Sequence, residues 1–373
     1  MKTIFKLKRI YLLGLIPISI LFIFLAKNSS FFAEDIYALH VYKWISQILS
    51  TITGILPFSL AEVLVILLPV TALVILIRFI ILMIAVKEGR LQRFFRGILN
   101  VLCTASVILF LFTMFGGLNY YRYPFSYYSN LTIQNSSVDE LYALTKSLAL
   151  QANDLRAQIP KTDANGVFQL AESNQVLAQK ANKAFTSLSK EYPVLGGSYG
   201  APKPVLFSNI MSSTEITGIF IPFTMEANVN VDIPDYSIPA TMFHELAHLR
   251  GFMREDEANF IAYLAGMNSG DVEFEYSSTM LALITAGNAL YDQNPLLYTE
   301  IRSLYSDGVI KDISANSEYW AKYDDTVVST VSNKINDTYL KANNQTDGVQ
   351  SYGRMLDLLL AQYRSEQQQN SNK

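Results

Sequence analysis

The chain has 373 residues, half of them hydrophobic, one cysteine and a formal net charge of −3. Such a length allows two domains, and the single cysteine, Cys103, excludes a disulfide framework. Residues 1–118 carry 11 Lys/Arg and 4 Asp/Glu, whereas the remainder carries 18 and 28. An acidic C-terminal part lacks the basic patch that usually marks nucleic-acid binding, so we expect no nucleic-acid partner. We therefore expect a basic region, 1–118, and an acidic domain, 119–373.

The N-terminal region contains three apolar stretches, at about 10–26, 57–86 and 97–118. A bilayer core takes about 20 helical residues, so each stretch is long enough, or nearly so, for a transmembrane helix. The first is short enough to be a signal peptide, but no convincing cleavage site follows it and two more apolar stretches do. We interpret it as an uncleaved anchor and expect the lipid bilayer as a partner.

Lys and Arg are placed asymmetrically around these stretches. They precede the first and separate the second from the third, whereas the segment Lys27–Leu56 contains few of them. Positive residues accumulate on the cytoplasmic side. We therefore predict a multi-pass protein of the cytoplasmic membrane with its N-terminus inside, Lys27–Leu56 outside, and everything from Asn119 onward extracytoplasmic.

Past the membrane region the pattern predicts a mostly α fold with a small β-sheet. Leucines at helical spacing follow a capping-box pattern at Ser137 and indicate a helix to about residue 159, with a second helix to about 192. Short runs rich in β-branched and aromatic residues predict strands at 205–208, 218–223 and 228–232. Helices are expected again at 276–291, 295–305, 317–340 and 350–363.

The pentapeptide His244-Glu245-Leu246-Ala247-His248 contains two of the three histidines of the chain. On a helix, residues four apart stack on one face, so His244 and His248 can place two imidazole nitrogens on one metal ion. Glu245 follows the first histidine, where a carboxylate can reach a water activated by that metal. Pro239 before the pentapeptide and Gly251 after it suit the two ends of such a helix.

A catalytic zinc site needs a third protein ligand. The pattern with a third histidine fails at Arg254, which occupies that position. The acidic run that follows offers Glu255 or Glu257, which point about 200° apart on one helix, so both cannot bind one ion. We prefer Glu255, because Asn259 shares its face and is placed to support either Glu255 or a motif histidine.

These residues resemble the core of gluzincin metallopeptidases, in particular membrane-associated zinc peptidases of the HtpX and CAAX-protease type. Nearly the whole chain also resembles an uncharacterised bacterial family with N-terminal membrane spans, an H-E-L-A-H helix and a late S-Y-G-R-M segment, here Ser351–Met355. That family is catalogued only as a domain of unknown function.

The resemblance implies a membrane-anchored zinc peptidase with one Zn²⁺ per chain, a peptide or protein substrate and Glu245 as the catalytic base. An oxyanion donor is also needed, and Tyr352 and Arg354 are candidates, although packing is the alternative role for both. In gluzincins a strand before the motif helix lines the cleft, so Asn228–Asp232 is either an edge strand that pairs with substrate or an ordinary strand.

Two other functions remain open at this point. The first is an inactive peptidase-like module that binds peptides or senses ligands without cutting them. The second is proteolysis within the membrane, which we disfavour because His244 lies 126 residues after Leu118, outside the apolar stretches.

Overall fold

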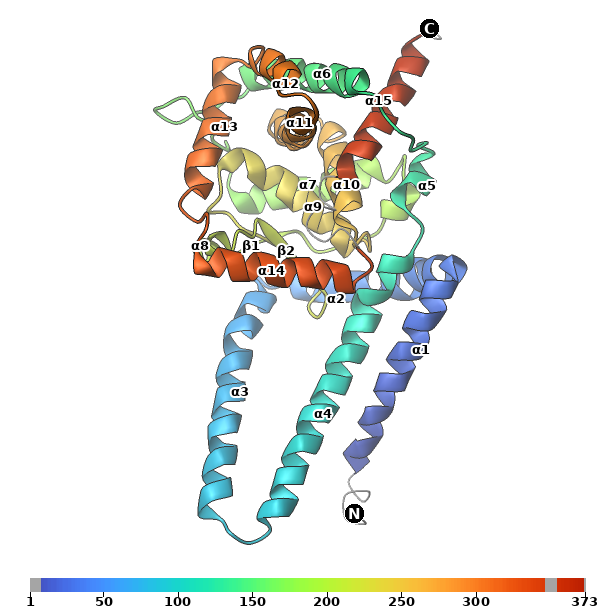
Figure 1. The fold of residues 1–373 in the computed structure, drawn as a ribbon, viewed down its shortest axis with the longest axis vertical. Coiled ribbons are helices and arrows are strands. Elements are labelled where there is room, and N and C mark those ends of the chain that lie inside the picture. Colours follow the sequence, from blue (N-terminus) through green and yellow to red (C-terminus); the bar gives the residue numbers. More distant parts are fainter. Residues whose placement is uncertain (1–7, 346–353, 372–373) are drawn as a thin grey trace.

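A computed structural model describes residues 8–345 and 354–371 of the chain. Three long helices stand on one side of a globular, mostly helical part (Figure 1). They are α1 (Leu15–Asn28, preceded by a 3₁₀ turn from Lys8), α3 (Leu60–Ala85) and α4 (Arg90–Phe115). In the described part of the chain, these three are long and apolar enough to cross a membrane, as the sequence predicted.

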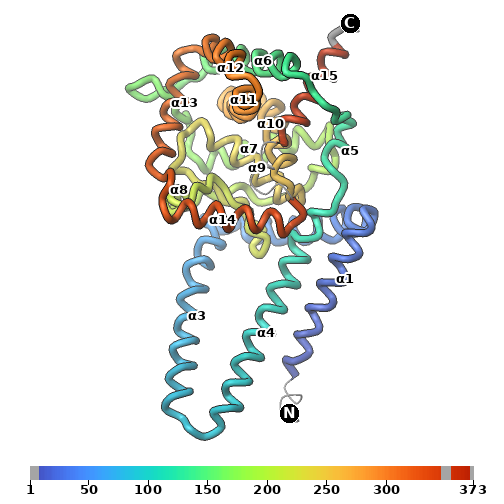
Figure 2. Tube along the Cα trace, in the orientation of Figure 1, coloured from blue at the N-terminus to red at the C-terminus, as the bar shows by residue number. Residues whose placement is uncertain are grey.

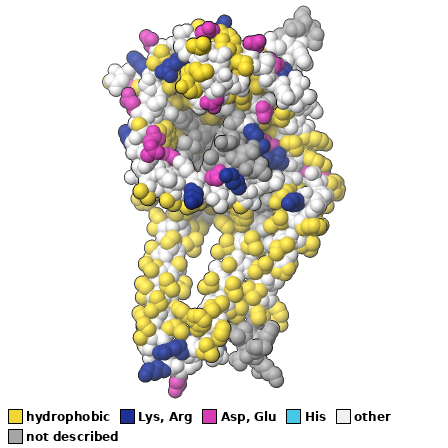
Figure 3. Space-filling view, viewed as in Figure 1, with side chains coloured by type: hydrophobic (Ala, Val, Ile, Leu, Met, Phe, Trp, Pro, Cys, Tyr) yellow, Lys and Arg dark blue, Asp and Glu magenta, His cyan; other side chains and the backbone are white. Residues whose placement is uncertain are grey.

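Most side chains of these helices face outward rather than into a protein core. Ala61 is the one buried residue of α3, and hydrophobic side chains cover the surfaces of α3 and α4 (Figure 3). Lys and Arg gather at the far end of this helical pair, around the turn that joins α3 to α4 (Figure 3). A surface this apolar is unstable in water, which indicates membrane association.

The segment predicted as an outer loop between the first two spans is folded. It forms a π-helix, η2 (Phe32–Tyr42), and the α-helix α2 (Lys43–Gly54), and both pack on the globular part. The buried Arg122 guanidinium donates to both carboxylate oxygens of Glu34 in η2, at 3.0 and 2.6 Å. Although these residues precede 118 in sequence, they pack with the acidic C-terminal part.

The globular part is built around three helices that pack on one another: α9 (Ile238–Leu249), α10 (Glu255–Met267) and α11 (Val272–Gln293). The predicted capping box is present at the start of α6 (Val138–Ala157), where Ser137 and Glu140 exchange hydrogen bonds. The remaining helices surround this core: α5 (Phe125–Ser129), α7 (Asn174–Leu188), α8 (Ser208–Ser213), α12 (Pro295–Arg302), α13 (Asp307–Trp320), α14 (Val327–Ala342) and α15 (Met355–Ser371).

The small sheet has the strand order β1-β3-β2. β1 (Lys203–Pro204) is parallel to β3 (Glu226–Val229), and β2 (Gly218–Ile221) is antiparallel to it. Of the two alternatives for Asn228–Asp232, the free edge is excluded, because Asn228 lies in the central strand and its register partners are Lys203 and Ile219. The alternative of an ordinary strand holds as far as Val229, where β3 ends. Strand order depends on contacts distant in sequence, which strand periodicity does not encode.

The helix predicted over 317–340 is two helices, α13 and α14. Asp325 has a φ of +55° between them, and the Thr326 side chain caps α14 by accepting from the Ser329 N–H. The helix predicted over 350–363 is described only from residue 354, and α15 continues to Ser371. α14 runs across the face of the globular part that is nearest the spans (Figure 2).

Candidate metal centre

The helix that carries the histidine pair ends where the sequence predicted. Gly251 has a φ of +89°, and the N–H groups of Gly251 and Phe252 bond back to the carbonyls of His248 and Ala247. These two bonds make a Schellman turn, which closes α9 and fixes the chain beyond it. A Cβ at Gly251 would approach the Tyr42 ring to 3.0 Å, so the turn needs glycine for space as well as for its backbone conformation.

The same turn orients the second histidine. His248 Nδ1 lies 2.8 Å from the carbonyl oxygen of Phe252. A carbonyl only accepts hydrogen bonds, so His248 must carry a proton on Nδ1, and in the neutral imidazole the Nε2 lone pair is then available to a metal. His244 has an equivalent support, since its Nδ1 lies 2.7 Å from Asn259 Oδ1 on α10. Both free Nε2 atoms then point to one place.

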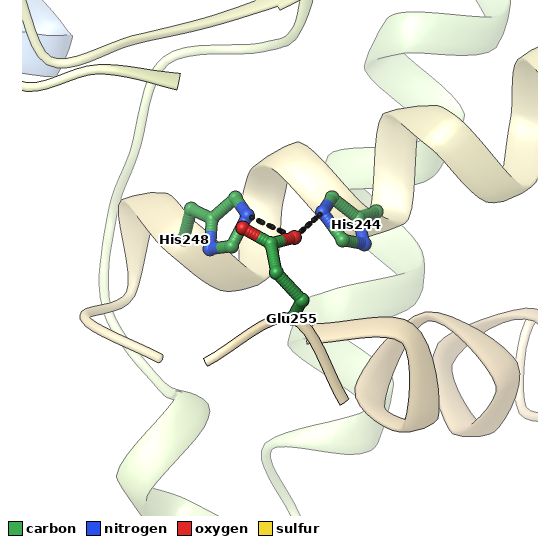
Figure 4. A group of neighbouring side chains, drawn as sticks. All are labelled: His244, His248 and Glu255. Carbon is green, nitrogen blue, oxygen red and sulfur yellow. Dashed lines mark ion pairs between the residues drawn. The ribbon is translucent and has the colours of Figure 1, made fainter. Parts of the chain in front are cut away.

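Glu255, the first residue of α10, brings a carboxylate oxygen to that place (Figure 4). Its Oε2 lies 3.1 Å from His244 Nε2 and 3.5 Å from His248 Nε2. The ligand atoms of the three residues all lie within 4.8 Å of one another. Neighbouring ligands of a tetrahedral zinc with bonds of about 2.0–2.1 Å stand about 3.3 Å apart, so this donor set fits a zinc ion.

The charges of His248 and Glu255 shift each other's pKa values. Burial alone would raise the pKa of Glu255, but the charges and hydrogen bonds of His248 and His244 outweigh it and hold that pKa well below its ordinary value. Burial would likewise lower the pKa of His248, yet the adjacent Glu255 raises it to about 9. The buried carboxylate therefore stays ionised, as a metal ligand must, whereas a metal would have to replace the proton that Glu255 favours on His248 Nε2.

The second acidic candidate points elsewhere. Glu257 Oε1 accepts from the Phe125 N–H at 3.0 Å and from Arg254 Nη1 at 2.8 Å. The structure thus brings Glu255, and not Glu257, to the two histidines, which agrees with the opposite faces that the two residues occupy on one helix.

Glu245 is the buried acid beside the cluster. It is 3% exposed, and its Oε2 has no hydrogen-bond partner. Burial raises the pKa of Glu245 from 4.5 to about 7, although both histidines act to lower it. A carboxyl that titrates near neutrality can exchange a proton with a bound reactant in either direction.

Strand β2 lines the site, which the sequence analysis did not foresee. Side chains alternate along a strand, so positions 218 and 220 share one face. A Cβ at Gly218 would stand 2.4 Å from Glu245 Oε1, and the ring of Phe220 lies 6.4 Å from that of His248. Because β2 is at the edge of the sheet, its outer side is not used by β3. The Gly-Ile-Phe run at 218–220 carried no metal-site signal that could have revealed this contact.

The two candidate oxyanion donors have different outcomes. Tyr352 lies outside the described residues. Arg354 lies near the first turn of α10, where burial raises the pKa of Asp256 and the charge of Arg354 opposes that rise.

Two further residues touch the ligand-bearing helices and were missed by sequence reasoning. Tyr42 donates to the His248 carbonyl at 3.2 Å, and Gln345 Oε1 accepts from the Glu255 N–H at 3.2 Å.

A family model described as a protein of unknown function, DUF3810, matches residues 37–360. The chain belongs to the DUF3810 family. No curated protein and no solved structure matches it. The DUF3810 match includes the histidine pair, Glu255, α2 and both long helices α3 and α4. The family description states no activity.

Proposed function

We propose that this protein is a membrane-anchored zinc metallopeptidase that hydrolyses peptide bonds on the extracytoplasmic side. The observation that carries the proposal is the convergence of His244 Nε2, His248 Nε2 and Glu255 Oε2, with the buried, unpartnered Glu245 Oε2 beside them. Three protein donors leave a fourth position of a tetrahedral zinc for a reactant, which is the arrangement of catalytic rather than structural zinc.

Each residue of the cluster has one task in this proposal. His244, His248 and Glu255 hold one zinc per chain, and Asn259 and the Phe252 carbonyl keep the two imidazoles in the ligating tautomer. Zinc supplies Lewis acidity, which polarises a carbonyl and makes water more acidic. Glu245 takes the proton from the attacking water and then gives it to the leaving amine. Its raised pKa, about 7, suits both directions of that transfer.

The substrate would be an extended peptide that lies along β2. Gly218–Ile221 is an edge strand whose 218/220 face lies against Glu245 and His248, so a peptide paired on its free edge would run past the cluster. Pairing through backbone groups gives affinity without a demand for particular side chains. This edge replaces Asn228–Asp232 as the candidate for substrate binding.

The proposed topology has the N-terminus in the cytoplasm and the globular part outside. The turn between α3 and α4 is rich in positive residues and lies at the opposite end of the spans from the globular part (Figure 3). Positive residues favour the cytoplasmic side of a membrane, so the globular part would be exported.

The test is Glu245→Gln in the full chain, purified in detergent and supplied with zinc and a mixture of peptides. The full chain is needed because η2 and α2 pack on the globular part. Loss of a general base should lower the hydrolysis rate by about 10²–10⁴-fold, while zinc content and melting temperature stay unchanged.

His244→Ala serves as the matched control and should lose both zinc and hydrolysis. Undiminished hydrolysis in Glu245→Gln would refute the role of Glu245. Peptide binding with zinc present, but with no cleavage by the wild type, would favour the inactive peptide-binding module instead.

A further inference from the structure

Helix α2 has its apolar face on the outside. Trp44, Ile48 and Ile52 of α2, and Ile55 directly after its last residue, lie three or four residues apart and are 67%, 54%, 57% and 79% exposed. The buried residues of α2 are small and polar, namely Ser46, Ser50 and Thr53. A helix on a water-soluble protein has the opposite arrangement. The outer face of α2 is therefore suited to an apolar surrounding.

The orientation of α2 is fixed by very close packing. A Cβ at Gly200 would stand 2.5 Å from the Ser50 carbonyl oxygen, and one at Gly54 would stand 3.2 Å from the Gly200 Cα. The small inner face is thus what allows the backbones to approach, and α2 cannot rotate to bury Ile48 and Ile52 without losing this contact. The helix also lies between two spans in sequence, α1 before it and α3 after it.

Helix α14 has an apolar outer stripe as well. Val327, Val331, Ile335 and Tyr339 recur every four residues and are 81%, 52%, 65% and 42% exposed. Of the whole helix, Ser329 and Leu340 are the buried residues. Polar groups attach its other side to the globular part, since Ser332 Oγ donates to the Thr214 carbonyl at 2.9 Å and Asn333 Nδ2 to Glu215 Oε2 at 2.7 Å.

Contacts with the spans show how deep these surfaces lie. The ring of Tyr339 stands 6.2 Å from that of Phe112, in the last turn of α4. The N–H groups of Leu206 and Phe207 donate to the Glu62 carboxylate, in the first turn of α3, at 3.2 and 2.7 Å. Leu206 itself is 77% exposed. Exposed apolar residues therefore stand level with the ends of α3 and α4 that meet the globular part.

We propose that α2, α14 and Leu206 form one lipid-binding surface, the membrane platform, which lies at the headgroup–acyl boundary of the bilayer. Both helices run across the side of the globular part from which the spans emerge (Figure 1). Amphipathic helices in this plane bury one apolar face among lipids, and Trp and Tyr rings such as Trp44 and Tyr339 favour that depth. Continuity with the apolar spans identifies the occupant as lipid rather than a soluble protein or a second copy.

The platform has a direct connection to the metal centre. Tyr42, immediately before α2, donates to the His248 and Leu249 carbonyls at 3.2 and 3.3 Å. Gln345, just after α14, accepts from the Glu255 N–H. The elements that carry the ligands are thus attached to both helices of the platform, which sets the histidine cluster close to the membrane surface.

The experiment places single nitroxide labels on the full chain in liposomes of phosphatidylcholine and phosphatidylglycerol. Cys103→Ser provides the background and keeps the hydrogen bond that Cys103 donates to the Arg9 carbonyl. Labels go on Ile48→Cys, Ile335→Cys and Leu206→Cys, all exposed positions whose replacement leaves the core intact. The matched control is Leu296→Cys, at a side chain that is 78% exposed. Leu296 belongs to α12, and this helix lies at the end of the globular part away from the spans (Figure 1).

Two collision rates are measured for each label: one with oxygen, which partitions into lipid, and one with a water-soluble nickel chelate. We expect at least about threefold preference for oxygen at the three platform positions and the reverse preference at Leu296, because apolar solutes concentrate in the hydrocarbon region. Platform labels that behave like the Leu296 label would overturn the proposal. Protection from both relaxers together with dipolar broadening would also overturn it, because that result identifies a second copy as the occupant.

Discussion

Asn259 Oδ1 on α10 accepts a hydrogen bond from His244 Nδ1 on α9, over a distance of 2.7 Å. This contact leaves the His244 Nε2 lone pair directed at the cluster, so Asn259→Leu should loosen the imidazole and weaken zinc binding by about 10–100-fold. Competition against a chromophoric chelator measures the change. Asn259→Asp keeps an acceptor at the same place and should bind zinc at least as tightly as the wild type. Equal affinity of the Leu variant and the wild type would refute this role for Asn259.

Zinc removal should destabilise the full chain. An ion that binds only the folded state stabilises it by about 2.7 kcal/mol when its free concentration is about 100 times the dissociation constant. Chelation should therefore lower the melting temperature of the wild type, and added zinc should restore it. His244→Ala lacks one ligand, so its melting temperature should not respond to either treatment. A wild-type melting temperature that is indifferent to zinc and chelator would contradict the proposed site.

The histidine cluster was predictable because its information is local. Helical spacing alone places His244 above His248 and separates Glu255 from Glu257, and the structure keeps both relationships. The surroundings of the cluster depend on distant contacts. Tyr42 donates a hydrogen bond to the His248 carbonyl, 206 residues away in sequence, and the sequence around Tyr42 does not predict this contact. The segment before α3 was interpreted as a loop, although Trp44, Ile48 and Ile52 recur at helical spacing. The sequence does not show that this apolar face points away from the protein core, because that depends on contacts distant in sequence.

The ion pair between Arg122 and Glu34 should be essential for attaching η2 to the globular part. Its side chains are 2% and 1% exposed, and the two charged groups lie 2.6 Å apart. Removal of one partner leaves the other charge buried and unpaired, which typically costs about 3–5 kcal/mol. We therefore expect Arg122→Met to lower the melting temperature of the zinc-free protein sharply.

The double variant Arg122→Met/Glu34→Met is the control for that experiment. It removes both charges, so it should be more stable than either single variant in the same melting assay. If the double variant is less stable than both single variants, the cost comes from lost packing rather than from an unpaired charge.

Gly218 should be required for hydrolysis through its contact with Glu245. A Cβ at this position would stand 2.4 Å from Glu245 Oε1 and 2.8 Å from Thr241 Cγ2, so Gly218→Ala must displace the carboxylate or the strand. A displacement of about 1 Å in a reacting group can cost about 10²-fold in rate. Zinc content should be unchanged, because the three atoms nearest to that Cβ belong to Glu245 and Thr241 and not to a metal ligand.

Ile219→Ala is the matched control, since Ile219 lies on the other face of β2 and is 39% exposed. It should keep both zinc and hydrolysis. The pair of variants separates the position of Glu245 from the general integrity of the strand. An equal loss of rate in the two variants would mean that β2 matters as a whole, whereas an unaffected Gly218→Ala would show that the carboxylate can move without consequence.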